Sequence, residues 1–327
     1  MDALKRTPGI SVEPAPLISV VIPTHNRSSL LRRSIQSVLA QTFRDFELFV
    51  VDDASTDDTS EMVRGFSDPR LHYIRLEKNR RAAAARNVGI GQARGQFLAF
   101  QDDDDIWLPH KLETQLAELA KQPASVGLNL CGHIKLSSQG ALYVGGAERF
   151  EGIDFSQGMN WKFGLIATPA WLVRREALER AGLFDEGMKA WDDWELALRL
   201  RDACEFSHTE EPLFIQDQRR STGPGMWDNE KNYANDMGII MQKHGHRWKD
   251  SPRVLAHHYM MMGRSEYWYH SVAEGRRLFW RAFRASPSPK SLAFYLLSHL
   301  GRGAIPAARK LVRALRGAAY RLLPGQG

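Results

Sequence analysis

Four consecutive aspartates directly follow a short apolar segment in the stretch Phe97–Trp107, FLAFQDDDDIW. Adjacent carboxylates repel one another, and their partial burial costs desolvation energy. A hard divalent cation such as Mg²⁺ offsets both costs, because it prefers oxygen ligands and is often held by one or two carboxylates plus substrate phosphates. The alternative is a solvated acidic turn. A second acidic pair, Asp52-Asp53, ends another apolar segment, and this recurrence favours a cation site.

Apolar segments alternate with amphipathic segments through the first part of the chain, as in sheets that carry helices on both faces. We expect parallel strands at 17–22, 46–51, 71–76 and 96–100, and helices at 28–41, around 62–63, at 80–95 and at 109–120, with Ser28 or Ser29 capping the first helix and Thr56 or Asp57 the second. Ligands bind such sheets outside the carboxyl ends of the strands. Both acidic clusters and the loop 23–27 fall at such ends, so we expect them to converge.

The second half of the chain predicts shorter strands and more helix. We expect short strands with a turn at 137–140 within 126–146, helices at 174–181 and 189–203, an edge strand at 211–216, and helices beyond about 223. Asp192 and Asp193 fall in the first turn of the 189–203 helix. Carboxylates at that position interact favourably with the helix dipole, so the pair is either a helix N-terminal feature or a functional group.

Several functional classes are disfavoured by the sequence. The glycines at 89, 91 and 95 end a helix and precede a strand, whereas the dinucleotide-binding fingerprint requires the strand first. Cys131 and Cys204 are the only cysteines, which argues against a zinc site and indicates a reducing compartment. The N-terminal residues lack the apolar core of a signal peptide, and the apolar stretch 292–297 is far shorter than the ~20 residues of a membrane span. We therefore expect a cytoplasmic protein.

The C-terminal region is strongly basic. From Gly275 onward the chain has no Asp or Glu, and its basic residues are Arg276, Arg277, Arg281, Arg284, Lys290, Arg302, Arg309, Lys310, Arg313, Arg316 and Arg321. Within 305–323 the residues Leu311, Leu315, Ala318 and Leu322 recur at helical spacing and form one apolar stripe. Such a helix either lies in an anionic membrane interface, at the inner face of the plasma membrane, or packs on the protein's own helices.

Five motifs follow one another along the chain: ISVVIPTHNR, FELFVVDDASTDDT, AAARNVGI, FLAFQDDDDIWLPHKLE and LFDEGMKAWDDWELALRL. Together they resemble family 2 glycosyltransferases of the GT-A fold, over roughly residues 17–220. The resemblance implies an α/β domain at 17–222 with a mostly parallel sheet flanked by helices. We expect a flexible arm before it at 1–16 and a helical, basic region after it at 223–327.

The resemblance also implies an activity. Such enzymes move a sugar from a nucleotide-diphosphate donor to an acceptor hydroxyl with inversion at the anomeric carbon. For this chain we expect a UDP-sugar as the favoured donor, a glycan or lipid-linked acceptor, and a role in bacterial surface polysaccharide or glycolipid synthesis. A divalent cation, Mn²⁺ or Mg²⁺, is the expected cofactor.

The resemblance assigns the donor site residue by residue. Asp53, with Asp52 beside it, is expected to recognise the nucleotide base, and the loop residues lining the nucleoside pocket are Pro23, Thr24, His25 and Asn26. The DXD element that holds the metal and the diphosphate corresponds to Asp102-Asp103-Asp104, with Asp104 as the first metal ligand and Asp102 as the second. Asp103 replaces the small residue usual at the middle position, which leaves the register of the ligands open by one place.

The acidic pair Asp192-Asp193 is expected to supply the catalytic base. In the family, the second member of an acidic pair before a helix has this role, which carries over to Asp193, with Asp192 beside it. An acceptor hydroxyl is a weak nucleophile and needs a carboxylate to take its proton. Inversion places that base on the face of the sugar opposite the diphosphate, so base and metal ligands must be different residues. Arg86 lies either beside the diphosphate or on a helix surface.

Two other functions fit parts of the sequence. A nucleotidyltransferase shares the α/β layout and a metal-binding aspartate, but its usual Gly-rich loop is absent from PTHNR. A non-catalytic module could bind nucleotide, or dock nucleic acid through the basic tail, but it predicts an incomplete acidic set, and all three clusters are intact. We therefore expect no nucleic-acid partner. A processive polysaccharide synthase is disfavoured by the missing QxxRW element and the missing membrane spans.

Overall fold

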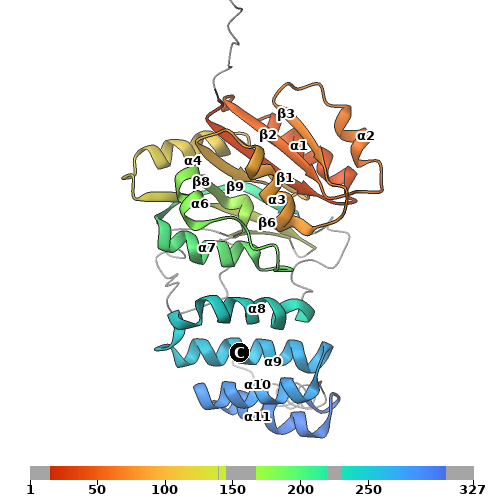
Figure 1. Ribbon diagram of the computed structural model, residues 1–327, viewed down its shortest axis with the longest axis vertical. Coiled ribbons are helices and arrows are strands. Elements are labelled where there is room, and N and C mark those ends of the chain that lie inside the picture. Colours follow the sequence, from red (N-terminus) through yellow and green to blue (C-terminus); the bar gives the residue numbers. More distant parts are fainter. Residues whose placement is uncertain (1–14, 139, 145–166, 218, 220–229, 307–327) are drawn as a thin grey trace, which may run out of the picture.

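The computed structural model describes residues 15–138, 140–144, 167–217, 219 and 230–306 (Figure 1). Its first half has the predicted alternation of strands and helices: β1 Ile18–Thr24, α1 Ser28–Leu39, β2 Phe46–Asp52, α2 Thr59–Arg64, β3 Leu71–Arg75, α3 Arg81–Gln92, β4 Phe97–Phe100, β5 Asp105–Trp107 and α4 Lys111–Ala120. Strand β1 is fully buried and pairs in parallel with β2 and β4, while β2 pairs in parallel with β3. The carboxyl ends of these strands therefore lie along one edge of the sheet.

The second half adds antiparallel strands to the same sheet. It contains β6 Val126–Ser137, β7 Gly140–Val144, the 3₁₀ turn η3 Thr168–Ala170, β8 Trp171–Arg174, α6 Arg175–Ala181, α7 Asp192–Ala203 and β9 Glu205–Asp217. In the described residues the sheet has nine strands in the order β3-β2-β1-β4-β8-β6-β9-β5, with β7 paired to β6. The α/β fold class is confirmed, with parallel pairing through the N-terminal half.

The predicted edge strand at 211–216 is wrong in position and length. Strand β9 begins at Glu205, pairs in parallel with β6 and antiparallel with β5, and so lies inside the sheet. The segment that covers its outer side is β5, which begins at Asp105, the last aspartate of the acidic cluster, and is only three residues long. A strand this short gives no alternating pattern in the sequence, so its place at the edge could not be anticipated.

The predicted helix caps are also shifted. Helix α1 begins at Ser28 with Arg27 as the N-cap residue and without a side-chain cap. The hydroxyl of Ser28 donates instead to a carboxylate of the neighbouring loop, that of Asp58. Asp58 is the N-cap residue of α2, where Asp57 accepts a hydrogen bond from the backbone N–H of Thr59 at 3.1 Å. Ser28 thus ties the loop after β1 to the loop after β2.

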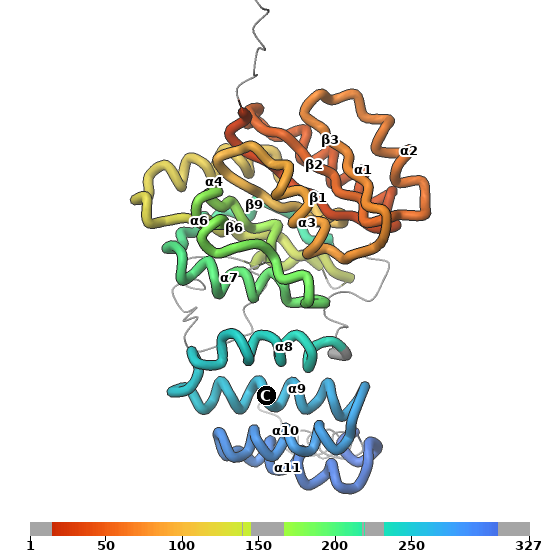
Figure 2. The backbone as a smooth tube through the Cα atoms, in the orientation of Figure 1, coloured from red at the N-terminus to blue at the C-terminus, as the bar shows by residue number. Residues whose placement is uncertain are grey.

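In the described residues, four further helices extend away from the sheet. They are α8 Glu230–His244, α9 Pro252–Tyr269, α10 Val272–Ala285 and α11 Pro289–Leu297, with the 3₁₀ turns η5 Gly245–Trp248 and η6 Ser298–Leu300. Figures 1 and 2 show α7 beneath the sheet and α8 to α11 stacked below it in chain order. No helix of the described part has both the length and the apolar content that a membrane crossing requires. The predicted apolar stripe at 311–322 lies outside the described residues.

Helix α8 belongs to the same hydrophobic core as the sheet. Its buried residues Tyr233, Met237 and Ile240 join the core cluster that also contains the strands and α7. In contrast, Tyr267, Phe279, Phe294 and Ile305 form a separate small core among the later helices. Trp194 of α7 stacks on Trp248 with ring centroids 5.9 Å apart. Helix α7 is therefore packed between the sheet and the C-terminal helices.

Candidate active site

Asp52, the last residue of β2, and Asp53, the first residue of the loop after it, fix the shape of that loop. Asp52 is fully buried, and its carboxylate accepts hydrogen bonds from the backbone N–H of Ser55 at 2.8 Å and the hydroxyl of Tyr73 at 2.5 Å. Asp53 accepts hydrogen bonds from the backbone N–H groups of Arg80 and Arg81, both at 2.7 Å. These contacts hold the start of α3 against the carboxyl end of β2. Base recognition by Asp53 remains a prediction.

The loop after β1 connects the two acidic regions. Pro23 and Thr24 end the strand, and the hydroxyl of Thr24 donates to Asp103 at 2.8 Å. His25 and Asn26 are exposed, with Nδ1 of His25 2.8 Å from the backbone oxygen of Asp53. The side-chain oxygen of Asn26 accepts from the backbone N–H of Thr56 at 2.6 Å. The two exposed side chains therefore stand at the same sheet edge as both clusters.

The four consecutive aspartates alternate between exposed and buried. The side chains of Asp102 and Asp104 are 31% and 24% exposed, whereas Asp103 and Asp105 are buried. Arg27 contacts Asp103 at 3.0 Å and Asp104 at 3.2 Å. Burial raises the pKa of Asp103 to about 6 against the opposing effect of Arg27. The pKa of Asp104 is raised by burial and by the neighbouring Asp102 carboxylate.

These carboxylates fit a divalent cation that the substrate helps to hold. In the described residues, no group of three or more His, Cys, Asp or Glu side chains is placed to bind a metal ion. The two partly exposed carboxylates, Asp102 and Asp104, supply hard oxygen atoms. Mg²⁺ is usually bound by one or two carboxylates together with substrate phosphates, so an incomplete protein set suits it.

The acidic pair Asp192-Asp193 lies in the first turn of helix α7. Asp192 is buried, and Asp193 is half-buried with a hydrogen bond from the backbone N–H of Trp194 at 2.7 Å. Neither aspartate is the N-cap residue, which is Trp191. Burial and the adjacent Asp192 carboxylate raise the pKa of Asp193 to about 7. A carboxylate with such a pKa can accept a proton near neutral pH.

Arg86 connects the two clusters. Its side chain is 8% exposed, and its two terminal nitrogens contact Asp192 at 2.9 Å and Asp102 at 2.8 Å. The guanidinium also lies over the ring of Phe184, with its central carbon 5.4 Å from the ring centroid. The helix-surface alternative for Arg86 is therefore wrong. Its position next to Asp102 agrees with the alternative that places it by the diphosphate.

Two residues of the site could not be found from the sequence. Arg27 ends the PTHNR loop, and its only signal is a positive charge next to a region that needs one. Asp236 lies on α8 and accepts a hydrogen bond from the backbone N–H of Ala190 at 2.8 Å, just before the acidic pair. Nothing local in the sequence distinguishes Asp236 from a surface aspartate, because its partners are backbone groups far along the chain.

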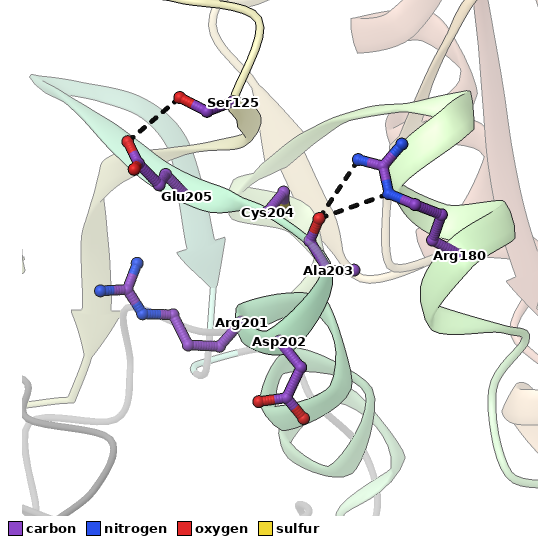
Figure 3. A pocket seen from close by; sticks show the side chains of 7 residues that line it. All are labelled: Ser125, Arg180, Arg201, Asp202, Ala203, Cys204 and Glu205. Carbon is purple, nitrogen blue, oxygen red and sulfur yellow. Dashed lines mark hydrogen bonds between the residues drawn. The ribbon is translucent and has the colours of Figure 1, made fainter.

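A cavity of about 420 Å³ lies apart from these residues (Figure 3). It is lined by Ser125, Arg180, Arg201, Asp202, Ala203, Cys204 and Glu205. These residues surround the C-terminal end of α7, whereas the acidic pair is at its N-terminal end. A helix of 12 residues is about 18 Å long at 1.5 Å per residue, so the cavity is not part of the acidic site.

The match to known families decides the class of protein. A family model described as Glycosyl transferase family 2 matches residues 19–182, the segment that carries the strand ends and the first acidic clusters. The chain belongs to glycosyl transferase family 2. The resemblance read from the motifs is thereby confirmed, and the matched region of the chain is a glycosyltransferase domain.

Curated relatives match over part of their length. The chain is 42% identical to WfgD of Escherichia coli over 109 residues, which is 33% of this chain and 43% of WfgD. It is 33% identical to WcaA of Escherichia coli K12 over 193 residues, 57% of this chain and 66% of WcaA. Its identity to TuaG of Bacillus subtilis is 35%, over 38% of this chain and 50% of TuaG. The matches thus span less than two thirds of each of these relatives.

Solved structures confirm the fold of the chain. S. aureus TarS 1–349 in complex with UDP-GlcNAc matches with a TM-score of 0.60 and 19% identity, over 92% of each chain. A mannosyltransferase from Pyrobaculum calidifontis, in complex with GDP-Man and Mn²⁺, matches with a TM-score of 0.56 and 17% identity, over 95% of this chain and 88% of that one. Both likenesses extend beyond the family match into the C-terminal helices.

Proposed function

We propose that this chain is an inverting glycosyltransferase that moves a sugar from a UDP-sugar to an acceptor hydroxyl. The observation that carries the proposal is the presence of two separate carboxylate clusters joined by one buried arginine, with Arg86 at 2.8 Å from Asp102 and 2.9 Å from Asp192. A single displacement requires charge neutralisation at the leaving group and a base elsewhere. Two adjacent but distinct clusters meet both needs.

The first cluster is assigned to the donor. Asp104 and Asp102 would hold a divalent cation, because they are the partly exposed members of the cluster and Asp103 is bound internally by Thr24 and Arg27. When bound, the cation neutralises the negative charge of the departing nucleoside diphosphate. Arg86 adds a positive charge on the same side. The alternation of partly exposed Asp102 and Asp104 with buried Asp103 favours the register in which Asp103 lies between the two metal ligands.

The nucleoside is assigned to the adjacent strand ends. Asp53, with Asp52 beside it, is assigned to recognition of the base. The base would lie against the loop that both residues stabilise. The loop after β1 supplies the exposed His25 and Asn26, with Pro23 and Thr24 buried at its root. We therefore assign the nucleoside to the carboxyl ends of β1 and β2, where ligands bind open α/β sheets.

The second cluster is assigned to the chemistry. Asp193 takes the proton of the acceptor hydroxyl as the hydroxyl oxygen attacks the anomeric carbon and the bond to the diphosphate breaks. Asp192 is held by Arg86, whereas Asp193 is more exposed and contacts a backbone amide. Burial and the Asp192 charge raise the pKa of Asp193 to about 7, which makes it a stronger base than an ordinary aspartate.

The relatives indicate the substrates and the pathway. WfgD is named as a UDP-Glc:alpha-D-GlcNAc-diphosphoundecaprenol beta-1,3-glucosyltransferase, which combines a UDP-sugar donor with a lipid-linked acceptor. The names of WcaA and TuaG place them in colanic acid and teichuronic acid biosynthesis. A bacterial surface polysaccharide or glycolipid is the corresponding product here. A lipid-linked acceptor would bring the protein to the cytoplasmic face of the membrane.

The basic C-terminus supports that location. In the described part, residues 275–306 contain no acidic side chain, and Arg281, Arg284 and Lys290 are exposed. Each basic residue near an anionic membrane surface contributes about 1 kcal/mol of binding. Five further basic residues fall within 305–327, namely Arg309, Lys310, Arg313, Arg316 and Arg321. Sedimentation with liposomes should therefore show binding that rises with anionic lipid content and weakens when residues 305–327 are removed. Binding that is independent of both the truncation and the lipid charge means that the tail serves only the fold.

A donor panel tests the proposed function. Release of nucleoside diphosphate is measured from a set of nucleotide sugars, beginning with UDP-glucose, with Mn²⁺ or Mg²⁺. Release of pyrophosphate from a nucleoside triphosphate and a sugar 1-phosphate, measured in parallel, would instead support a nucleotidyltransferase. With the active donor, Asp193→Asn should leave donor affinity nearly unchanged and reduce kcat by ~10²–10⁴, because loss of a general base affects the transition state alone. A larger effect of Asp192→Asn would move the base by one residue.

A further inference from the structure

Asp236 of helix α8 is a buried carboxylate that accepts hydrogen bonds from two backbone N–H groups and one side-chain amide. It is fully buried and accepts hydrogen bonds from the backbone N–H of Lys189 at 3.1 Å and 3.2 Å, one to each oxygen. The N–H of Ala190 donates to the second oxygen at 2.8 Å, and the side-chain amide of Asn235 donates to the first at 2.9 Å. Burying a carboxylate is costly unless its hydrogen bonds are made, and here they are made to one short loop.

That loop leads directly into the acidic pair. Lys189 and Ala190 precede Trp191, the N-cap residue of α7, and then Asp192. Trp191 also packs edge-on against Tyr233 of α8, with ring centroids 5.6 Å apart. Helix α8 therefore holds the entry into α7 by a hydrogen-bonded carboxylate and an aromatic contact.

The other end of the same loop is held from the donor side. The side chain of Asn87 on α3 accepts from the backbone N–H of Phe184 at 3.0 Å and donates to the carbonyl of Phe184 at 2.9 Å. Arg86, the residue next to Asn87, contacts the acidic pair itself. The segment 183–191 is thus fixed by α3 at its start and by α8 at its end.

We propose that Asp236 is a positioning residue for glycosyl transfer, which sets the place of the catalytic base Asp193 by fixing the loop before α7. An apolar residue at position 236 would serve the packing of α8 equally well, so the buried carboxylate is explained by the loop it holds. The charge of Asp236 also acts on the acidic pair Asp192-Asp193. Burial raises the pKa of Asp192, and the charges of Asp102 and Asp236 act in the same direction.

Other contacts between α7 and the C-terminal helices lie further along α7. Glu195 is buried and contacts Lys243 at 3.2 Å and His244 at 3.1 Å. At the C-terminal end, Asp202 pairs with Arg247, with one contact at 2.9 Å and a side chain that is 58% exposed. Asp202 therefore offers a matched control, because Asp202→Asn makes the same chemical change on a contact between the same two parts of the molecule.

The test compares Asp236→Asn with Asp202→Asn in the full chain. The donor is the nucleotide sugar that the wild-type chain turns over in the panel, and affinity is measured with its nucleoside diphosphate. Misplacing a catalytic group by about 1 Å can cost ~10² in rate, so kcat of Asp236→Asn should fall by ~10- to 100-fold while the affinity stays within about twofold. Asp202→Asn should match the wild type in both quantities.

Three results would overturn the positioning role. The first is a kcat of Asp236→Asn equal to that of the wild type. The second is a loss of nucleoside diphosphate affinity in Asp236→Asn as large as its loss of kcat. The third is a loss of kcat in Asp202→Asn as large as that in Asp236→Asn. If Asp236→Asn does not fold, Asp236→Glu keeps the charge and the acceptor atoms but is longer by one methylene. It should also lose kcat at unchanged affinity, and wild-type kcat in it overturns the proposal.

The positioning role rests on the proposed function of Asp193, so Asp193→Asn is measured alongside. An inactive Asp193→Asn with an unaffected Asp236→Asn removes the positioning role alone. A fully active Asp193→Asn removes the assigned base itself, whatever Asp236→Asn does. The two failures are therefore distinguishable.

Discussion

Replacing Arg86 should destabilise the protein in a pH-dependent way. The Arg86→Gln variant removes the positive charge between Asp192, whose side chain is 10% exposed, and Asp102, which is 31% exposed. Removing one partner of a buried ion pair typically costs ~3–5 kcal/mol, because the remaining charge is left uncompensated. The Asp102 share is reduced by solvent screening, since that carboxylate is nearly one-third exposed. We therefore expect the lower end, ~3 kcal/mol of unfolding free energy, at about pH 8.

The sign of the pH dependence follows from Asp192. Burial raises its pKa, and Arg86 acts in the opposite direction. Without Arg86 the pKa of Asp192 in the folded state rises further above its unfolded value. A carboxyl with a raised folded pKa destabilises the fold when the pH is above that pKa, and the effect fades as the pH falls toward the unfolded value. The stability difference between variant and wild type should therefore be large at about pH 8 and shrink toward about pH 5.

Urea unfolding at the two pH values measures this difference. Arg81→Gln is the control, because Arg81 is an exposed arginine at the start of the same helix and should change stability by no more than ~0.5 kcal/mol. Arg86→Lys keeps the charge without the planar fork that reaches both carboxylates, so it should lie between wild type and Arg86→Gln. Equal stability of Arg86→Gln and wild type at about pH 8, or an equal loss at both pH values, would refute the reasoning.

Three further predictions concern the metal, the base and the packing of α3. Asp104→Asn should lose most metal-dependent turnover but keep its fold, because removing one carboxylate from a crowded cluster relieves repulsion. Full activity of this variant, or full activity of the wild type in excess EDTA, contradicts the metal assignment. The kcat for nucleoside diphosphate release should fall as the pH drops through about 7, because Asp193 must be deprotonated to act as base, and a flat profile across that region argues against it. Gly89→Ala should lower the free energy of unfolding in urea by ~1–3 kcal/mol, because a Cβ there would lie 2.5 Å from Cγ1 of Val21. Gly91→Ala is the control, since a Cβ there meets open space and should not destabilise the fold. Equal effects of the two substitutions would contradict the packing of α3.

Periodicity and the position of ligands in open α/β sheets predicted that the two N-terminal acidic clusters and the loop after β1 lie along one edge of the sheet. The β-branched run before Pro23, the apolar runs before Asp52 and Asp102, and the alternation of strands with helices are local signals, and the topology then brings the strand ends together. The alternation of exposure within the acidic run was not predictable from DDDD. It depends on Thr24 and Arg27, which come from another strand end and bind Asp103.

Contacts between segments far apart in the sequence could not be predicted. The three alanines before Arg86 are buried and let α3 lie close to the sheet, which turns Arg86 inward. The sequence showed the alanines but not which face they cover. The interior position of β9 depends on pairing with β6 and β5, and the role of Asp236 depends on how α8 packs under α7. Neither pairing leaves a pattern in its own segment.

The anomeric configuration of the first product distinguishes a single displacement from a double one. Proton NMR during turnover identifies the anomer that forms first when the chain transfers or hydrolyses the sugar of an α-linked UDP-sugar. A single displacement assisted by Asp193, with the metal carboxylates on the departing diphosphate, predicts that the β-anomer forms first. Initial formation of the α-anomer would contradict the separation of base and donor clusters on which the account depends.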